Sequence, residues 1–390
     1  MLRVLTLSTL FPDVTRPNFG VFVEQQTLGL AAHPDVELRV VAPIGVPPWL
    51  LSLVSHHRGF RSVPERETWK GLDVRRPRFA TIPGTGARFH AVTLVRRLIP
   101  LLTGIRRDFA FDVIDAEFFF PDGPAAVALG AHFGVPVSIK ARGSDVHLWG
   151  HAAGTAALVR KAGERADGLL AVSGAMKADM AAIGMPVERI RVHHTGVDLA
   201  RFAPRERAAA KLHYGVTGPL IVSLGALIPR KGHDVVIDAV AAIPGATLLI
   251  AGEGPERAAL EARIAARGLG DRVWLLGSIA HDALPGLLAA ADVMALASAS
   301  EGLANAWVEA LACGTPIVIT AAGGAAEVVT EPLFGRIVAR EPQAFTAAIR
   351  ALLDMPPAQA DVRRGAERFT WEANSAALFE HLTSLVAHFL

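Results

Sequence analysis

The most regular feature of the sequence is an alternation between short runs of valine, isoleucine and leucine and longer alanine-rich stretches. The short runs are apolar at nearly every position, which is typical of strands covered on both faces. The longer stretches have apolar residues at helical spacing. Strands and helices that alternate in this way predict an α/β fold with parallel sheets. The expected strands are residues 3–8, 38–42, 113–115, 135–140, 169–173, 190–194, 220–224, 247–251, 273–276, 293–296 and 316–320.

These strands form one series in each half of the chain, so the sequence predicts two doubly wound domains. A length of 390 residues agrees with two or three domains. The first series closes near residues 196–210, and we place the boundary between residues 198 and 199. The first domain is therefore expected over 1–198 and the second over 199–370. Residues 371–390 predict an amphipathic helix, because the apolar side chains follow helical spacing at Ala377, Leu378, Leu382, Leu385, Val386 and Phe389.

Composition narrows the class of protein. Apolar residues make up 51% of the chain, yet no apolar run approaches the roughly 18 residues of a membrane span. The opening MLRVLTLSTLF has one arginine and no small-residue cleavage site, so we interpret it as a first strand rather than a signal sequence. The single cysteine, Cys313, excludes an intrachain disulfide and a cysteine-cluster metal site. These features favour a reducing, cytoplasmic location.

Basic residues are concentrated in one segment, although the net charge is only +2. Residues 58–107 hold twelve Lys and Arg but three acids. Just upstream lies PPWLLSLV, residues 47–54, an apolar stretch with a tryptophan. This combination predicts peripheral contact with an anionic membrane, at the inner face of the plasma membrane. The alternative is a solvated basic face beside an ordinary core helix.

Glycines end three strands of the second series. Gly225 opens GALIPRKGHD, in which Arg230, Lys231 and Gly232 precede a helix, and two cations beside a helix N-terminus predict an anion site. The alternative is a turn with two solvated cations. Gly252 and Gly254 open GEGPER after the next strand, and GSIAHDAL follows the third. In open parallel sheets ligands bind at these strand ends, where glycines allow close backbone approach.

Two glutamates lie in the stretch SEGLANAWVEALACGTP, residues 300–316. A helix is expected over 304–312, which places Glu301 at the mouth of the sheet and Glu309 one turn deeper. A carboxylate in apolar surroundings needs a partner, and paired acceptors suit a ligand rich in hydroxyls, such as a ribose or hexose. The backbone amides of Gly302, Leu303 and Ala304 are expected to add donors. The alternative is a capping acid and a surface acid.

The ordered set of motifs resembles the retaining nucleotide-sugar glycosyltransferases of family 4, which have the GT-B fold. The resemblance rests on the glutamate pair followed by ALACGTP, and it covers nearly the whole chain. The other motifs are GVDLARF at 196–202, GALIPRKG at 225–232, GEGPER at 252–257 and GGAAEVV at 323–329. It implies two Rossmann-like domains facing across a cleft, with the C-terminal helix crossing back to the first. The opening FP…PNFG…FVEQQ with RGSD is closest to members that build cell-surface polysaccharides.

The resemblance also implies roles for individual residues. Lys231 would bind the donor's diphosphate, Glu309 the ribose hydroxyls and Glu301 the transferred sugar. Gly20 matches a glycine that lets the first domain's loop approach the phosphates. Arg230 is expected to supply the charge that many members carry where this chain has Ala226.

The stretch RGSD departs from the family's usual His-Gly-Thr-Asp. Arg142 replaces the histidine, so a neutral-imidazole role is excluded and contact with the donor's phosphate or sugar is expected instead. Asp145 is expected to orient the acceptor hydroxyl. In HHTGVD, His193 and His194 are interpreted as plain strand-end residues.

The expected activity is transfer of a hexose from a UDP- or GDP-sugar to a hydroxyl acceptor, with retention, in polysaccharide or glycolipid synthesis. A lipid-linked acceptor fits the basic segment, and neither a cofactor, a metal nor a nucleic-acid partner is expected. Two alternatives stay open: a sugar-nucleotide epimerase of the same fold and a non-catalytic two-lobed sugar-binding protein. A dinucleotide oxidoreductase needs a G-x-G-x-x-G turn. That motif is absent, because Leu227 and Arg257 occupy glycine positions in its two nearest matches.

Overall fold

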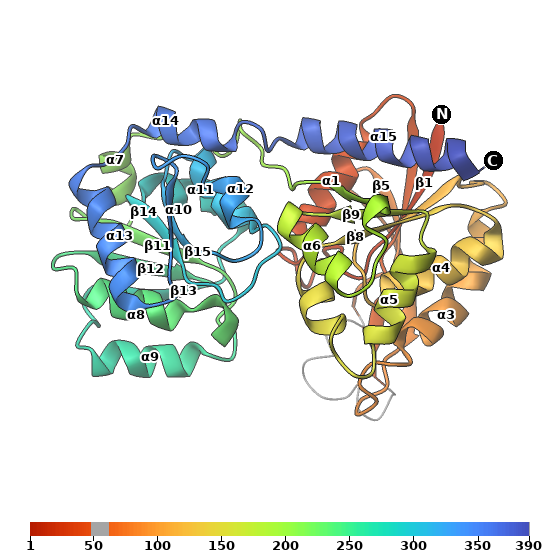
Figure 1. Ribbon diagram of the computed structural model, residues 1–390, viewed down its shortest axis with the longest axis horizontal. Helices are drawn as coiled ribbons and strands as arrows, with labels where there is room; N and C mark the ends of the chain where they lie inside the picture. The colour runs from red at the N-terminus through yellow and green to blue at the C-terminus, as the bar shows by residue number, and fades with distance from the viewer. Residues whose placement is uncertain (48–61, 390) are drawn as a thin grey trace. The chain divides into compact units, whose positions relative to one another are not determined.

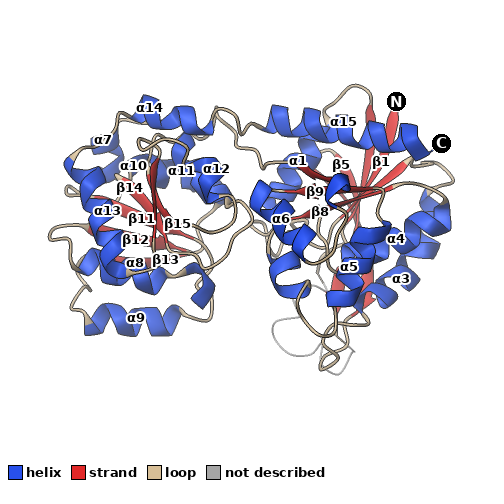
Figure 2. Ribbon diagram, viewed as in Figure 1, coloured by secondary structure: helices blue, strands red, loops and turns tan. Residues whose placement is uncertain are grey.

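The computed structural model describes residues 1–47 and 62–389 and divides into two compact units (Figures 1 and 2). Unit 1 comprises Met1–His194 and Trp371–Leu390, and unit 2 comprises Thr195–Thr370. The division falls four residues before the boundary expected at 198/199. Most of the apolar stretch 47–54 and two basic residues, Arg58 and Arg61, lie outside the described residues.

Unit 1 is built on an eight-stranded sheet in the order β10-β9-β8-β7-β1-β2-β5-β4, parallel except for the β4–β5 pair. Its strands are β1 (Leu2–Leu7), β2 (Val36–Val41), β4 (Arg66–Trp69), β5 (Leu72–Arg75), β7 (Val113–Ala116), β8 (Val137–Ala141), β9 (Gly168–Ala171) and β10 (Ile190–Val192). A small second sheet pairs β3 (Ile44–Val46) with β6 (Arg78–Ala80). The helices are α1 (Val21–Ala31), α3 (His90–Ile105), α4 (Asp122–Phe133), α5 (Ala156–Arg165), α6 (Gly174–Ala182) and α15 (Trp371–Phe389).

Unit 2 is built on a six-stranded parallel sheet in the order β13-β12-β11-β14-β15-β16. Its strands are β11 (Leu220–Leu224), β12 (Thr247–Ala251), β13 (Val273–Gly277), β14 (Val293–Leu296), β15 (Ile317–Thr320) and β16 (Gly335–Val338). The helices α8 (His233–Ala241), α9 (Arg257–Ala266) and α13 (Pro342–Asp354) pack as one layer. The helices α7 (Arg207–Leu212), α10 (Leu284–Ala290), α11 (Asn305–Ala312) and α14 (Gln359–Arg363) pack as another, and α12 (Ala325–Val328) follows β15.

The central strands confirm the prediction, made from the continuous apolar runs, of strands covered on both faces. Every residue of β11, β12, β14 and β15 is buried, because helices cover both faces of the sheet. Each expected strand is present, with its ends shifted by at most a few residues. The helix expected over 304–312 is α11, and it ends where Gly314 takes a left-handed backbone conformation, with φ 73°, before Pro316.

Five strands were not expected from the sequence: β3, β4, β5, β6 and β16. β4 has the sequence RETW with no fully buried residue, so it lacks an apolar signal. It belongs to the sheet only because it pairs antiparallel with β5.

The C-terminal helix α15 belongs to unit 1, as the fold class implied. Leu378 and Leu382 are buried in a cluster with Leu2, Val4, Leu30, Val36, Val113 and Leu170. A hydrogen bond also orients the helix: Asn374 Nδ2 donates to the carbonyl of His194 at 2.6 Å. The helix therefore completes the core of unit 1 rather than lying loosely on it.

Replacement of Leu382 by alanine should destabilise unit 1 by about 2–5 kcal/mol, because the residue is fully buried and truncation leaves a cavity. The free energy of unfolding is measured by chemical denaturation followed by circular dichroism. Glu380→Ala, at an exposed position of the same helix, is the matched control and should change little. Equal effects of the two substitutions would contradict the packing described for α15.

Candidate functional site

In unit 2, a lysine and a glutamate meet beyond the carboxyl ends of β11 and β14. Lys231 Nζ lies 2.5 Å from Glu301 Oε1, and Ser298 Oγ donates to the same oxygen at 2.6 Å. Both charged side chains are largely buried, with 15% and 9% of their surface exposed. Burial of an ion costs free energy that its partner must offset. The Lys231–Glu301 contact is thus a largely buried, direct ion pair at the strand ends.

Arg230 places a second cation on the same carboxylate. Its Nη1 donates to the carbonyl of Ser300 at 2.5 Å and lies 3.5 Å from Glu301 Oε2. Two cations and one carboxylate leave one net positive charge at this point. Arg230 is also the more exposed cation, with 37% of its side-chain surface accessible. The arrangement is suited to holding an anion.

The turn that carries Lys231 is held by close backbone packing. Gly232 has φ 67°, and a Cβ there would lie 2.2 Å from the carbonyl oxygen of Ala297, which follows β14. No side chain fits such a contact. Gly232 therefore presses the lysine turn against the loop that carries Glu301.

The glycines that end β11 and β12 pack against each other's loops. A Cβ at Gly252 would lie 1.8 Å from the oxygen of Gly225, and one at Gly254 would lie 2.3 Å from the oxygen of Leu227. The stem of Lys231 runs beside Gly225, with its Cδ 3.4 Å from where a Cβ would be. In this structure these glycines allow the two loops to approach each other closely. Close approach of their backbone to a ligand stays a prediction.

Glu309 lies on α11 and is 9% exposed. His281 Nε2, in the turn after β13, lies 3.1 Å from Glu309 Oε1. The negative charge also acts on Cys313, whose thiol pKa is raised to about 12 by burial and then by Glu309. Cys313 is therefore an inert buried thiol.

Gly302, Leu303 and Ala304 connect Glu301 to α11. The carbonyl of Gly302 accepts from the amide of Gly324 at 2.8 Å, and the carbonyl of Ala304 accepts from Trp307 at 3.0 Å. Leu303 is buried. The role expected for their amides stays a prediction.

In unit 1, Gly20 begins α1 in the left-handed conformation, with φ 71°. A Cβ at this position would lie 1.5 Å from the carbonyl oxygen of Leu10. The loop between β1 and α1 is therefore folded tightly onto itself, and approach of this loop to a phosphate stays a prediction.

Arg142 follows β8 and is held by Glu117, which follows β7. Arg142 Nε donates to the carbonyl of Glu117 at 2.8 Å, and Nη2 pairs with its carboxylate. The guanidinium also lies over the ring of Phe22 at 4.8 Å. Its side chain is only 7% exposed. Arg142 is thus largely occupied by protein partners, which leaves little of the predicted sugar or phosphate contact.

Asp145 is fully buried, and its carboxylate accepts only from backbone amides. The donors are Gly143 at 2.7 Å, Arg142 at 3.0 Å and Phe119 at 3.1 Å. Burial raises the pKa of this carboxyl, and the amide hydrogen bonds partly offset the effect. With no exposed oxygen, Asp145 anchors the loop, and this geometry does not support the expected contact with an acceptor.

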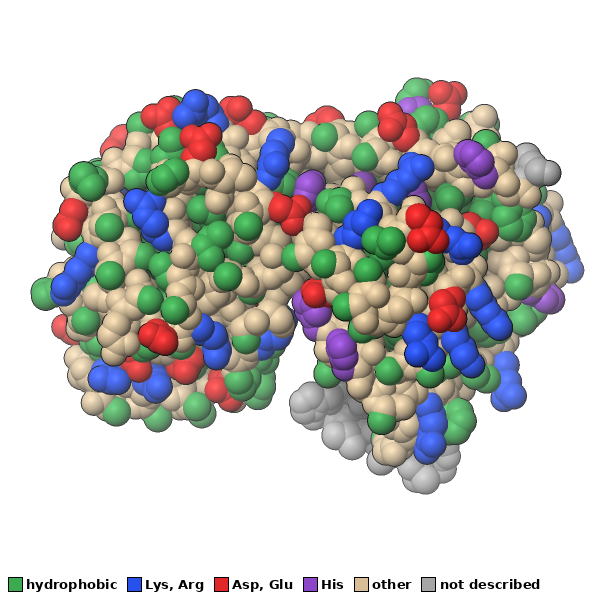
Figure 3. All heavy atoms as spheres, in the orientation of Figure 1, with side chains coloured by type: hydrophobic (Ala, Val, Ile, Leu, Met, Phe, Trp, Pro, Cys, Tyr) green, Lys and Arg blue, Asp and Glu red, His purple; other side chains and the backbone are tan. Residues whose placement is uncertain are grey.

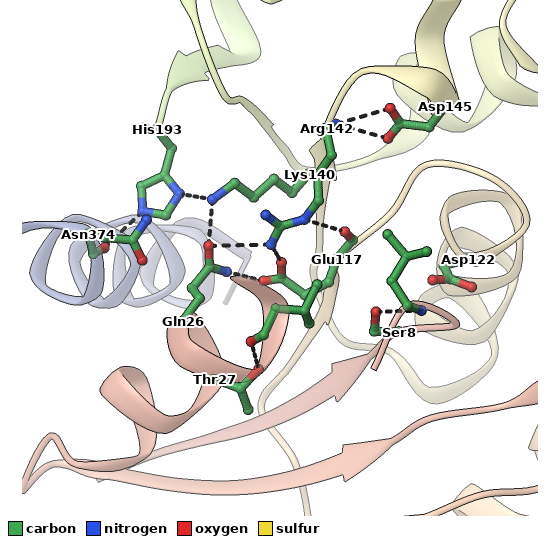
Figure 4. Close-up of polar contacts among 12 residues, drawn as sticks. Ser8, Gln26, Thr27, Glu117, Asp122, Lys140, Arg142, Asp145, His193 and Asn374 are labelled. Carbon is green, nitrogen blue, oxygen red and sulfur yellow. Dashed lines mark hydrogen bonds and ion pairs between the residues drawn. The ribbon is translucent and has the colours of Figure 1, made fainter. Parts of the chain in front are cut away.

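A buried polar network continues from Arg142 to α15 (Figure 4). Lys140 Nζ donates to Gln26 Oε1 and to His193 Nδ1, each at 2.5 Å, and Gln26 Nε2 donates to Glu117. His193 Nε2 donates to the carbonyl of Asn374 at 2.8 Å. His193 is therefore more than the plain strand-end residue expected from the sequence.

The protonation states in this network follow from burial and charge. Burial lowers the pKa of Lys140 well below its usual value, and nearby Arg142 lowers it further. Burial and then Lys140 likewise lower the pKa of His193. Burial opposes ionisation of Glu117, but Arg142 and Lys140 outweigh it and lower its pKa. The lowered pKa of Glu117 agrees with its ion pair with Arg142.

Sequence reasoning missed Glu117, Lys140, Gln26 and His281. Glu117 and His281 stand just after strands, so the strand-end rule that found Lys231 could have found them too. In the described parts of the chain, residues 1–47 and 62–389, no group of three or more His, Cys, Asp and Glu side chains is arranged to hold a metal ion. No described helix is long and apolar enough to cross a membrane.

Comparison with known protein families gives two matches that together span most of the chain. The model described as Glycosyltransferase Family 4 matches residues 38–201, and the model described as Glycosyl transferases group 1 matches residues 204–369. The two matched segments lie mainly in unit 1 and in unit 2, respectively.

Curated relatives match over about half of the chain. A GDP-mannose-dependent alpha-(1-6)-phosphatidylinositol dimannoside mannosyltransferase of Mycobacterium tuberculosis is 37% identical over 199 residues, which are 49% of this chain and 51% of that protein. A D-inositol 3-phosphate glycosyltransferase of Mycobacterium bovis is 36% identical over 210 residues, 50% of this chain and 44% of that protein. The chain thus spans about half the length of the curated relatives it matches.

Solved structures match over the whole chain. Sucrose-phosphate synthase from Thermosynechococcus elongatus superimposes with a TM-score of 0.84 at 22% identity and covers 100% of both chains. Anabaena HepE in complex with UDP-glucose gives a TM-score of 0.73 at 21% identity, over 98% of this chain and 100% of that one. At these identities the likeness shows the fold. The two family models, which match residues 38–201 and 204–369, show that the chain belongs to family 4 of the glycosyltransferases, and the solved structures show the GT-B fold.

Proposed function

We propose that this protein transfers a sugar from a nucleoside-diphosphate sugar to a hydroxyl acceptor, with retention of anomeric configuration. The observation that carries the proposal is the cluster of Lys231, Arg230 and Glu301 at the strand ends of unit 2. The relatives add support, because the mycobacterial mannosyltransferase is GDP-mannose-dependent and HepE forms a complex with UDP-glucose. Both donor types therefore stay candidates.

The cluster has the chemistry that departure of a diphosphate requires. As the bond from the sugar to the leaving oxygen breaks, negative charge develops on the phosphate, and Lys231 and Arg230 would stabilise it. Glu301 holds Lys231 in place before the donor arrives. Ser298 and Lys231 both contact Oε1, whereas Oε2 has the longer contact of 3.5 Å to Arg230, so Oε2 is the better placed to accept from a hydroxyl of the sugar.

Retention would follow from attack on the same face as the leaving group. The acceptor oxygen bonds to the anomeric carbon while the leaving phosphate oxygen takes the hydroxyl proton. Charge and atoms balance without a protein base, which agrees with the burial of Asp145. Proton NMR of the product's anomeric linkage, compared with the donor, tests retention.

An epimerase of the same fold and a non-catalytic sugar-binding protein are the competing functions. A thermal-shift screen of UDP, GDP and ADP identifies the nucleotide. Release of free nucleoside diphosphate that depends on an added hydroxyl acceptor then separates transfer from epimerisation. Binding without any turnover would favour the sugar-binding protein.

We also propose that the acceptor is lipid-linked and that unit 1 meets the cytoplasmic face of an anionic membrane, in cell-surface polysaccharide or glycolipid synthesis. Several basic residues of segment 58–107 form ion pairs within unit 1. Arg76 is buried against Glu67, and Arg66 and Arg75 pair with Asp73. The support comes from α3, where Arg96 and Arg97 are exposed, and from Arg107, which is exposed two residues after α3 ends. Exposed Phe89 and Val92 lie at its start. Figure 3 shows Lys and Arg side chains, with acids among them, on the face of unit 1 where α4 and α5 lie in front of α3.

Lys231→Ala should lower kcat by roughly two to three orders of magnitude, the usual effect of removing one donor to a developing anion. Steady-state kinetics with the identified donor measure the loss. Lys161→Ala, which removes an exposed lysine of α5, is the control and should keep wild-type rates. A near-wild-type Lys231→Ala enzyme would remove the lysine from the mechanism.

Glu309→Ala should chiefly weaken nucleotide binding, by roughly tenfold or more, since a charged hydrogen-bond acceptor is lost. Isothermal titration calorimetry with the nucleoside diphosphate gives the affinity. Glu331→Ala, at an exposed loop position, should bind normally. Unchanged affinity in Glu309→Ala would count against contact with the ribose.

The double substitution Arg96→Glu and Arg97→Glu should weaken binding to anionic vesicles at least roughly tenfold, because each basic residue near the surface contributes about 1 kcal/mol. Flotation at low salt with phosphatidylserine-containing vesicles measures binding. The variant with lysine at both positions keeps the charge and should float like wild type. Wild-type protein that does not float at low salt would refute the membrane proposal.

A further inference from the structure

The carboxylate of Glu309 is tied to a histidine from a different part of unit 2. His281 lies in the short turn after β13, and its Nε2 is 3.1 Å from Glu309 Oε1. The two side chains are only 23% and 12% exposed, so solvent screens the contact weakly. No described residue donates to the second oxygen, Oε2. One oxygen of Glu309 is therefore held by His281, and the other has no donor among the described residues.

The other ring nitrogen of His281 is held by an arginine. Arg201 Nη2 lies 2.9 Å from His281 Nδ1. A guanidinium has donors and no acceptor, so Nδ1 must accept this hydrogen bond through its lone pair. The proton of the neutral ring is then on Nε2, which donates it to Glu309 Oε1. Arg201 thus selects the tautomer that can bind the carboxylate.

Arg201 and its neighbour also fix the imidazole in space. Arg201 forms an ion pair with Asp282 at 2.7 Å, beside His281 in the same turn. The ring of Phe202, which is buried, has its centroid 5.5 Å from that of His281. Arg201 and Phe202 belong to the motif GVDLARF, to which the proposed mechanism assigns no other role. The motif therefore holds the imidazole ring of His281 in place.

We propose that His281, oriented by Arg201, is a positioning residue that holds Glu309 ready for the ribose hydroxyls of a nucleoside diphosphate. The inference rests on the proposed function and deepens it. A glutamate side chain loses conformational freedom when it binds a ligand. The hydrogen bond to His281 restricts Glu309 beforehand and leaves Oε2 without a donor from the described residues, so less freedom is lost on binding.

The test is discrimination between ribose and deoxyribose, which a merely structural histidine would not alter. Isothermal titration calorimetry compares UDP and GDP with 2′-deoxy-UDP and 2′-deoxy-GDP, and the ratio of the two Kd values is the readout. In the wild-type protein we expect the ribose form of the preferred nucleotide to bind roughly tenfold or more tightly. In His281→Ala the ratio should fall to about threefold or less.

Two further variants sharpen the comparison. His281→Gln keeps an N–H donor at a similar distance from the backbone and should recover much of the wild-type ratio. His213→Ala removes an exposed histidine elsewhere in unit 2 and should keep both the affinity and the ratio. Arg201→Met leaves His281 in place and removes the donor to Nδ1, so its ratio should fall by a smaller factor. Arg201→Met also carries the test if circular dichroism shows that His281→Ala does not fold.

The outcomes separate this inference from the proposed function. If wild-type protein binds neither nucleotide, both are refuted. If it binds a nucleotide and His281→Ala weakens both sugar forms equally, so that the ratio is unchanged, the inference alone is overturned. A reduced ratio in His281→Ala with a wild-type ratio in Arg201→Met supports His281 and overturns the part assigned to Arg201.

Discussion

The contact between Lys231 and Glu301 is the interaction on which the candidate site of unit 2 depends. Both groups are largely buried, so removal of either one leaves the other without its nearest opposite charge, and breaking such a pair costs roughly 3–5 kcal/mol. Together they hold the lysine in place at the strand ends. Arg230 adds a second cation and gives the cluster its net positive charge.

Close backbone packing fixes the positions of the loops that carry these charged side chains. The lysine turn and the glutamate loop come from strands that are far apart in sequence, and they meet where Gly232 lies against Ala297. The turns after β11 and β12 interlock at Gly252 and Gly254 in the same way. These glycines set the distances between loops, because any side chain would force the loops apart. The positions of the charged groups are therefore consequences of loop packing.

Unit 1 uses its charges differently. Glu117 and Arg142 neutralise each other in the interior, and Lys140, Gln26 and His193 extend the network to α15. The hydrogen bonds that join these side chains each have a donor facing an acceptor, although Asn374 Oδ1 and both carboxylate oxygens of Asp115 are buried without a hydrogen-bond partner. The network ties the C-terminal helix to the strand ends of unit 1, so the polar residues of this network support the fold.

The sequence by itself determined the alternation of strands and helices, the apolar face of α15 and the position of α11, because each depends on residues close together along the chain. It also placed Lys231, Glu301 and Glu309 beyond strand ends, since that follows from topology. Only the tertiary structure decided the partners. Lys231 and Glu301 are 70 residues apart, and His281 and Glu309 are 28 apart. Arg142 and Asp145 looked available in the sequence, yet both are occupied by protein groups, and β4 became a strand only through its neighbour β5. The burial and pairing of these polar side chains are properties of the packed chain, and the local pattern of residues does not specify them.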